Sequence, residues 1–78
     1  MNTSAENINR IMYINQKGEL FLQFRPDDKS SKMKASIEVL HESGTVVHYQ
    51  EHIGGITIEG VVNRVTKSGI ALRNWRIG

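Results

Sequence analysis

The stretch HIGGITIEGVVNRVTKSGIALRNWRI, residues 52 to 77, decides the fold of this chain. Its paired glycines, Gly54 and Gly55, predict a tight turn, and the β-branched residues that follow predict a long strand from Ile56 to Thr66. Gly60 lies inside this strand, where a glycine indicates a bulge or a sharp bend. TKSG then predicts a second turn, and IALRNWRI predicts the final strand.

Strand patterns also precede this segment. RIMYI (residues 10–14) and ELFLQFR (residues 19–25) are joined by NQKG, which supplies a glycine for a hairpin turn. In ELFLQFR the apolar residues Leu20, Leu22 and Phe24 alternate with a mixed face that Phe21 interrupts. TVVHYQEHI (residues 45–53) is β-branched and aromatic, and predicts a further strand.

The segment from residue 26 to residue 44 is less regular. PDDKSSK (residues 26–32) is polar and aperiodic, which indicates a mobile connecting loop. Met33–Leu40 alternates apolar and polar residues, so we predict a strand that continues through an ESG hairpin connection. A helix remains the alternative for this segment because Met, Lys, Ala, Glu and Leu are good helix formers.

Together these patterns predict an all-β fold of about six strands in hairpin order, with little or no helix. The expected architecture is a small antiparallel β-barrel or a strongly bent sheet. IEGVVNRVTKSGIALRN resembles the hairpin of small β-barrels of the SH3-like, Sm-like and S1 or OB-like types, a pattern that unrelated proteins share. We expect residues 1–9 to be a flexible N-terminus and residues 10–78 to form a single small β domain.

The composition indicates the cellular environment of the protein and its tendency to self-associate. The 78 residues include no cysteine, which excludes disulfides and thiolate metal sites and fits a cytoplasmic protein. The chain has no apolar run near the ~20 residues that span a bilayer, and its first residues lack a signal-peptide pattern, so we expect a soluble protein that does not contact membranes. A core this small favours self-association, and we expect a homo-oligomer that buries Phe21 or part of the strand around Tyr49.

Charge is distributed unevenly along the chain. The formal net charge is only +2, yet residues 60–78 contain four basic residues and no acidic one. Acidic residues are in excess over the first 59 positions. A basic contact surface at the C-terminal end follows if the basic side chains share a face of the sheet. They are Arg64, Lys67, Arg73 and Arg76.

Trp75 lies among these cations and has two interpretations. It packs as the last core anchor while the arginines face solvent, or it stands outside beside Arg73 as a contact residue. Strict strand alternation puts Arg73 and Trp75 on one face, and Ile70 and Leu72 on the other. Because Ile70 and Leu72 look like core residues, alternation favours an exposed Trp75.

No pattern for catalysis or metal binding is present. His48 and His52 are four residues apart on one strand, which separates them by ~13 Å, and neither His41 nor a carboxylate pair completes a tetrahedral zinc site. The chain contains no nucleophile elbow, phosphate loop or dinucleotide fingerprint. We therefore expect a protein that is not an enzyme and that uses no metal and no cofactor.

The remaining function is binding. We expect a small non-enzymatic module for protein–protein interaction, acting as a regulator or inhibitor, and we take a nucleic-acid-binding β-barrel as the alternative. The small net charge favours a protein partner over nucleic acid. The predicted partner-binding residues are Arg64, Lys67, Arg73, Trp75 and Arg76.

Overall fold

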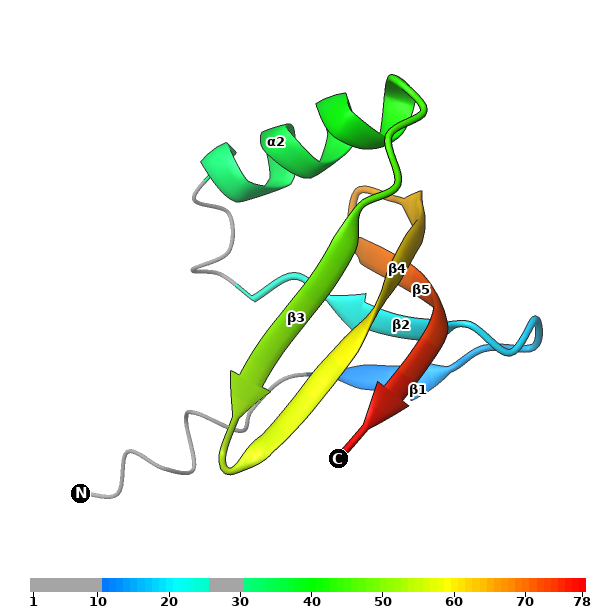
Figure 1. The fold of residues 1–78 in the computed structure, drawn as a ribbon, viewed down its shortest axis with the longest axis vertical. Coiled ribbons are helices and arrows are strands. Elements are labelled where there is room, and N and C mark those ends of the chain that lie inside the picture. The colour runs from blue at the N-terminus through cyan, green and yellow to red at the C-terminus, as the bar shows by residue number, and fades with distance from the viewer. Residues whose placement is uncertain (1–10, 26–30) are drawn as a thin grey trace.

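The computed structural model describes residues 11–25 and 31–78, which form five strands and one helix (Figure 1). The flexible N-terminus expected at residues 1–9 lies outside the described residues, as does most of the loop expected at 26–32. The elements in chain order are β1 (Met12–Ile14), β2 (Leu20–Gln23), α2 (Ser31–Glu42), β3 (His48–Ile53), β4 (Ile56–Val65) and β5 (Gly69–Ile77).

All strand pairs are antiparallel, and the sheet has the order β1-β2-β5-β4-β3. The last strand thus returns to the middle of the sheet, between β2 and β4. The prediction of a mostly antiparallel β fold is confirmed. The described strands number five rather than six, and the sheet is not closed into a barrel, because β1 and β3 each pair with one neighbour only.

The strand expected at Met33–Leu40 is wrong, because this segment belongs to helix α2. The helix ends in a Schellman motif, in which Thr45 N donates to Leu40 O at 3.0 Å and Gly44 N donates to His41 O at 3.1 Å. Gly44 has a φ of 87°, which a glycine adopts without strain. The expected ESG hairpin is therefore a helix end. Within the described residues, no helix has the length and apolar character to cross a membrane.

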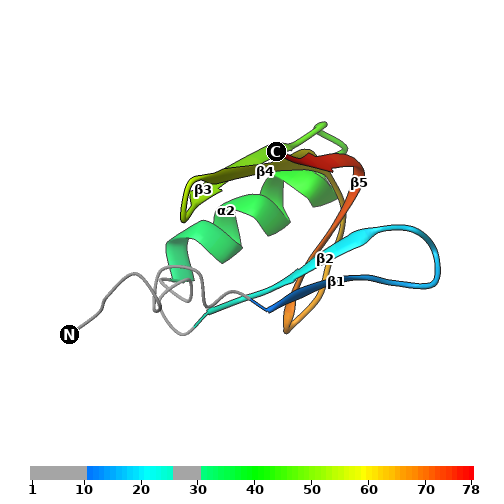
Figure 2. The same ribbon diagram turned by 90° about the horizontal axis from the view of Figure 1, so that it is seen from below.

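The core lies between the two arms of the bent sheet. Figure 2 shows β3 and β4 on one side and β1 and β2 on the other, and Figure 1 shows α2 across one end of the sheet. The helix contributes Ile37, which is 7% exposed. The largest fully buried side chains come from the strands, as alternation predicts: Leu20, Leu22, Ile58, Ile70 and Leu72. Burial of such side chains is the main stabilising contribution, at about 1.5 to 3 kcal/mol each.

Two bulges interrupt the pairing of β4 with β5. Val62 pairs with Leu72 and Arg64 pairs with Ala71, so Asn63 is an extra residue in β4. The pairing also shifts between Glu59 and Val61, which confirms the irregularity predicted at Gly60.

At this second shift the extra residue lies in β5. Asn74 and Trp75 stand opposite Gly60, and Asn74 has a φ of 49°. A Cβ atom on Gly60 would lie 3.0 Å from Cβ of Trp75, so a larger residue would fit only if β5 moved away by a few tenths of an ångström. The extra residue reverses the alternation of β5 from Asn74 onward.

Candidate functional site

The reversal at Asn74 changes the position of Trp75. The exposed placement beside Arg73 is wrong, because Trp75 is partly buried and packs against the hydrophobic core. Its Nε1 donates a hydrogen bond to the carbonyl oxygen of Gly18 at 2.9 Å, which ties β5 to the turn before β2. Trp75 is therefore the core anchor of the first interpretation rather than an exposed platform.

Two of the four predicted cations are paired with carboxylates. Arg64 forms an ion pair with Glu19 at 2.8 Å, and Arg76 forms an ion pair with Glu59. Two of the four charges are thus neutralised by carboxylates from other parts of the chain. Lys67, in the β4–β5 turn, and Arg73, opposite Val61, are exposed and form no ion pair within the described residues.

Glu19 organises the first bulge. Its carboxylate is only 7% exposed and accepts hydrogen bonds from Arg64, Asn15 and Asn63. These bonds, with that from Arg64 the strongest cause, lower the pKa of Glu19 from 4.5 to about 2. The cluster links the β1–β2 turn to the bulge in β4. Because its polar groups bond to one another, we assign it a structural role.

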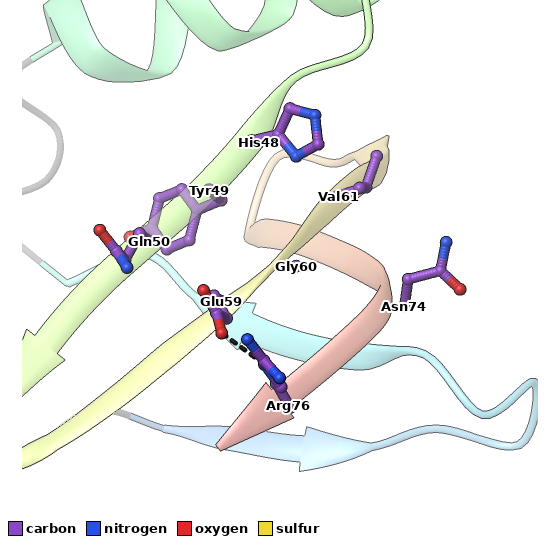
Figure 3. Close-up of a pocket in the computed structure, with 8 residues that line it drawn as sticks. All are labelled: His48, Tyr49, Gln50, Glu59, Gly60, Val61, Asn74 and Arg76. Carbon is purple, nitrogen blue, oxygen red and sulfur yellow. Dashed lines mark hydrogen bonds and ion pairs between the residues drawn. The ribbon is translucent and has the colours of Figure 1, made fainter. Parts of the chain in front are cut away.

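The second bulge opens onto a hollow of about 720 Å³ on the outer face of β3, β4 and β5. Figure 3 shows side chains from all three strands around it, with the Glu59–Arg76 ion pair in the middle. The lining of the hollow is polar and apolar in about equal parts and carries both charge signs. Its lining residues are His48, Tyr49, Gln50, Glu59, Gly60, Val61, Asn74 and Arg76.

The three histidines, His41, His48 and His52, have different surroundings. His41 Nε2 donates to the carbonyl oxygen of Asn63 at 3.1 Å, and His52 Nδ1 lies 3.0 Å from the hydroxyl of Thr57. His48 lines the hollow. In the described part of the chain, no group of three His, Asp or Glu side chains is placed to hold a metal ion.

The hollow is bordered by β3, an edge strand. Val62 N donates to Val47 O at 2.9 Å, so Val47, just before β3, directs its backbone groups toward β4. In an antiparallel ladder this direction alternates, and His48, Gln50 and His52 therefore direct their N–H and C=O groups away from β4. Among residues 11–25 and 31–78, no strand pairs with that side of β3.

Phe21, the other site expected to support self-association, is covered within the chain. Phe21 is 8% exposed, and its ring lies 5.4 Å from that of Tyr13. The strand around Tyr49 is therefore the better candidate for contact with another chain.

Sequence reasoning identified Arg76 but missed His48, Gln50 and Asn74. The signal that could have found Asn74 is the asparagine in each long strand, since asparagine is depleted in strands and both Asn63 and Asn74 lie at bulges. Comparisons with protein-family models, curated proteins and solved structures find no match to this chain.

Proposed function

We propose that this chain is a non-enzymatic protein-binding module that takes up an extended segment of a partner along the open edge of β3. The partner's backbone pairs with the outward N–H and C=O groups of β3, and its side chains enter the adjoining hollow. This is recognition by strand addition, in which main-chain bonds give affinity and neighbouring pockets give specificity.

One observation carries this proposal: β3 is a six-residue edge strand, and no other strand within residues 11–25 and 31–78 pairs with its open side. Edge strands are commonly protected by lysine, proline, a bulge or short length. The sequence of β3, HYQEHI, contains neither lysine nor proline, and its pairing with β4 is regular. Its one charged residue, Glu51, forms an ion pair with Arg25 at 3.1 Å.

The same geometry supports a protein partner over nucleic acid. Single-stranded nucleic acid needs a run of cations and an aromatic plane for base stacking. Here Arg64 and Arg76 are paired with carboxylates, and Trp75 packs against the core. A hollow that carries both charge signs and apolar surface matches a protein segment better than a phosphate backbone.

Gln50→Pro provides the test. Proline removes the Gln50 N–H, which points to the open side, so the β3–β4 ladder keeps its bonds. The matched control is Gln50→Thr, which keeps the N–H and favours a strand. Both variants should melt near the wild-type temperature.

With wild-type protein immobilised at low density, we expect nuclease-treated lysate to yield a bound protein that Gln50→Thr retains and Gln50→Pro loses. Bound material that disappears on nuclease treatment, or with moderate salt, would support the nucleic-acid alternative instead.

A further inference from the structure

We infer that in the purified protein β3 pairs with β3 of a second copy of this chain, antiparallel to the first about a two-fold axis at Gln50. This inference rests on the proposed function, because the open edge that takes up a segment of another protein is the edge that pairs with itself. A two-fold axis is the commonest symmetry of soluble oligomers, and it lets one surface serve both subunits.

The backbone of β3 is complementary to itself in this register. With Gln50 on the axis, Gln50 meets Gln50 of the partner subunit, and His48 meets His52 of the partner subunit. All three are residues whose N–H and C=O groups point to the open side. Three such pairs make roughly six backbone hydrogen bonds, because each hydrogen-bonded pair of an antiparallel ladder exchanges two. The open groups of His48–His52 in both copies are then satisfied together.

Charge favours the axis at Gln50 over its neighbours. An axis at Glu51 would set two carboxylates directly opposite each other, which destabilises a strand pair. An axis at Gln50 places Glu51 opposite Tyr49 of the partner subunit. Within one chain the Tyr49 hydroxyl already donates to the Glu51 carboxylate at 2.7 Å, so these two side chains are chemically matched. An axis at Tyr49 would pair fewer residues within β3.

The other edge of the sheet is a poorer partner. β1 has three residues against six in β3, and a short edge strand is itself a form of protection. In the described sheet, the edge at β1 is thus protected by its short length, and the edge at β3 is long enough to pair. Pairing of β3 with β3 joins two sheets into one continuous sheet with a β1 strand at each end.

The interface is small. A strand pair over His48–His52 is expected to bury less than the roughly 1,200 Å² of a stable, specific interface. We therefore expect a reversible dimer whose population rises with protein concentration, rather than an obligate one.

Single cysteines test the register directly, because the chain contains none of its own. Residues on the axis have Cα atoms about 5.5 Å apart, within the range for a disulfide. Under mild oxidation Gln50→Cys should form a covalent dimer at least tenfold faster than Gln16→Cys, a control at the exposed β1–β2 turn.

Off-axis positions give the second readout. His48→Cys and His52→Cys should each crosslink slowly alone, and rapidly when the two proteins are mixed. Equal rates for Gln50→Cys and Gln16→Cys would overturn the dimer. Rapid crosslinking of His48→Cys with itself would overturn the register. Circular dichroism of each variant before oxidation establishes that it is folded.

Sedimentation separates this inference from the proposed function. We expect wild-type protein to shift from monomer to dimer with rising concentration, and Gln50→Pro to remain monomeric. A wild-type protein that stays monomeric, while Gln50→Pro still abolishes capture of another protein, would overturn the dimer and leave strand addition in place. If Gln50→Pro changes neither mass nor capture, both proposals fail.

Discussion

The two bulges of the β4–β5 ladder are used in opposite ways. At Asn63 the polar side chains turn toward one another around Glu19, and that carboxylate is almost completely covered. At Asn74 the polar side chains surround an open hollow, and Arg76 is 81% exposed. The first bulge closes a contact between distant parts of the chain, and the second leaves a surface for another molecule.

The difference separates residues that look alike in the sequence. Arg64 and Arg76 both belong to the basic C-terminal segment, and both bind a glutamate. The partner of Arg64 is 7% exposed, whereas the partner of Arg76 is 34% exposed. Whether a charged residue is structural or available for binding therefore depends on the burial of its partner, which composition does not reveal.

The largest effect is expected where the second bulge turns a side chain inward. Trp75→Ala removes a partly buried indole from the core and breaks its bond to Gly18, and should lower the free energy of unfolding by about 2 to 4 kcal/mol. Trp75→Phe keeps most of the packing and should cost about 1 kcal/mol. Urea unfolding followed by circular dichroism measures both. A Trp75→Ala variant as stable as wild type would place the indole outside, as strict alternation had predicted.

The next largest effect is a loss of stability at low pH. The pKa of Glu19 is about 2 in the folded chain and 4.5 as an ordinary value, so the unfolded state binds the proton more readily. The stability that Glu19 contributes is present above pH 4.5 and is lost as the pH falls from about 4.5 to about 2. We expect the thermal midpoint to fall across this window.

Matched variants assign this acid response to the first bulge. In Glu19→Gln the midpoint should already be lower at pH 7, and its fall below pH 4.5 should be smaller. Glu59→Gln, at the second bulge, should keep the wild-type response. An unchanged acid response in Glu19→Gln would show that another carboxylate is responsible.

Much of the sheet was predictable from the sequence because its strands alternate regularly. Leu20, Leu22, Ile70 and Leu72 were expected in the core and are buried there. The helix was missed because Met33 and Ile37 fit both a strand face and one helical turn. Gly44 was the unused signal for a helix end.

The site was less predictable. Alternation fails after Asn74 because one residue with a positive φ shifts every later side chain to the other face. The bond between Glu19 and Arg64 joins residues 45 positions apart, and no local pattern encodes such a contact. The β3 strand itself was expected, but its place at the edge depends on the return of β5 to the middle of the sheet.

A smaller effect is expected at Asn74. Its φ of 49° is unfavourable for residues with a Cβ atom, and asparagine tolerates it better than alanine does. Asn74→Ala should cost about 1 kcal/mol, whereas Asn74→Gly should be near neutral or slightly stabilising. Equal stability of the two variants in urea would mean that the bulge does not require a left-handed backbone at Asn74. The inward position of Trp75 would then need another cause.

The smallest effect on folding should come from the ion pair in the hollow. Arg76 is 81% exposed and Glu59 is 34% exposed, and pairs of this kind contribute about 0 to 1 kcal/mol. Arg76→Ala should therefore change the free energy of unfolding by no more than about 0.5 kcal/mol.

Arg76→Ala also tests whether the hollow belongs to the surface that forms the β3 dimer. Glu59 pairs with Gln50 across the sheet, so loss of Arg76 leaves an unbalanced carboxylate beside the proposed two-fold axis. In the β3 dimer the Glu59 residues of the two subunits lie on either side of the two Gln50 residues, with Cα atoms roughly 14 Å apart. Their repulsion should weaken dimerisation slightly and only at low salt, because physiological salt screens charges at this distance. The double variant Arg76→Ala with Glu59→Gln removes this charge and should restore the dimer. Sedimentation at two salt concentrations measures the dimerisation of each variant. An Arg76→Ala dimer as strong as the wild-type dimer at low salt would show that the hollow is not part of the contact surface.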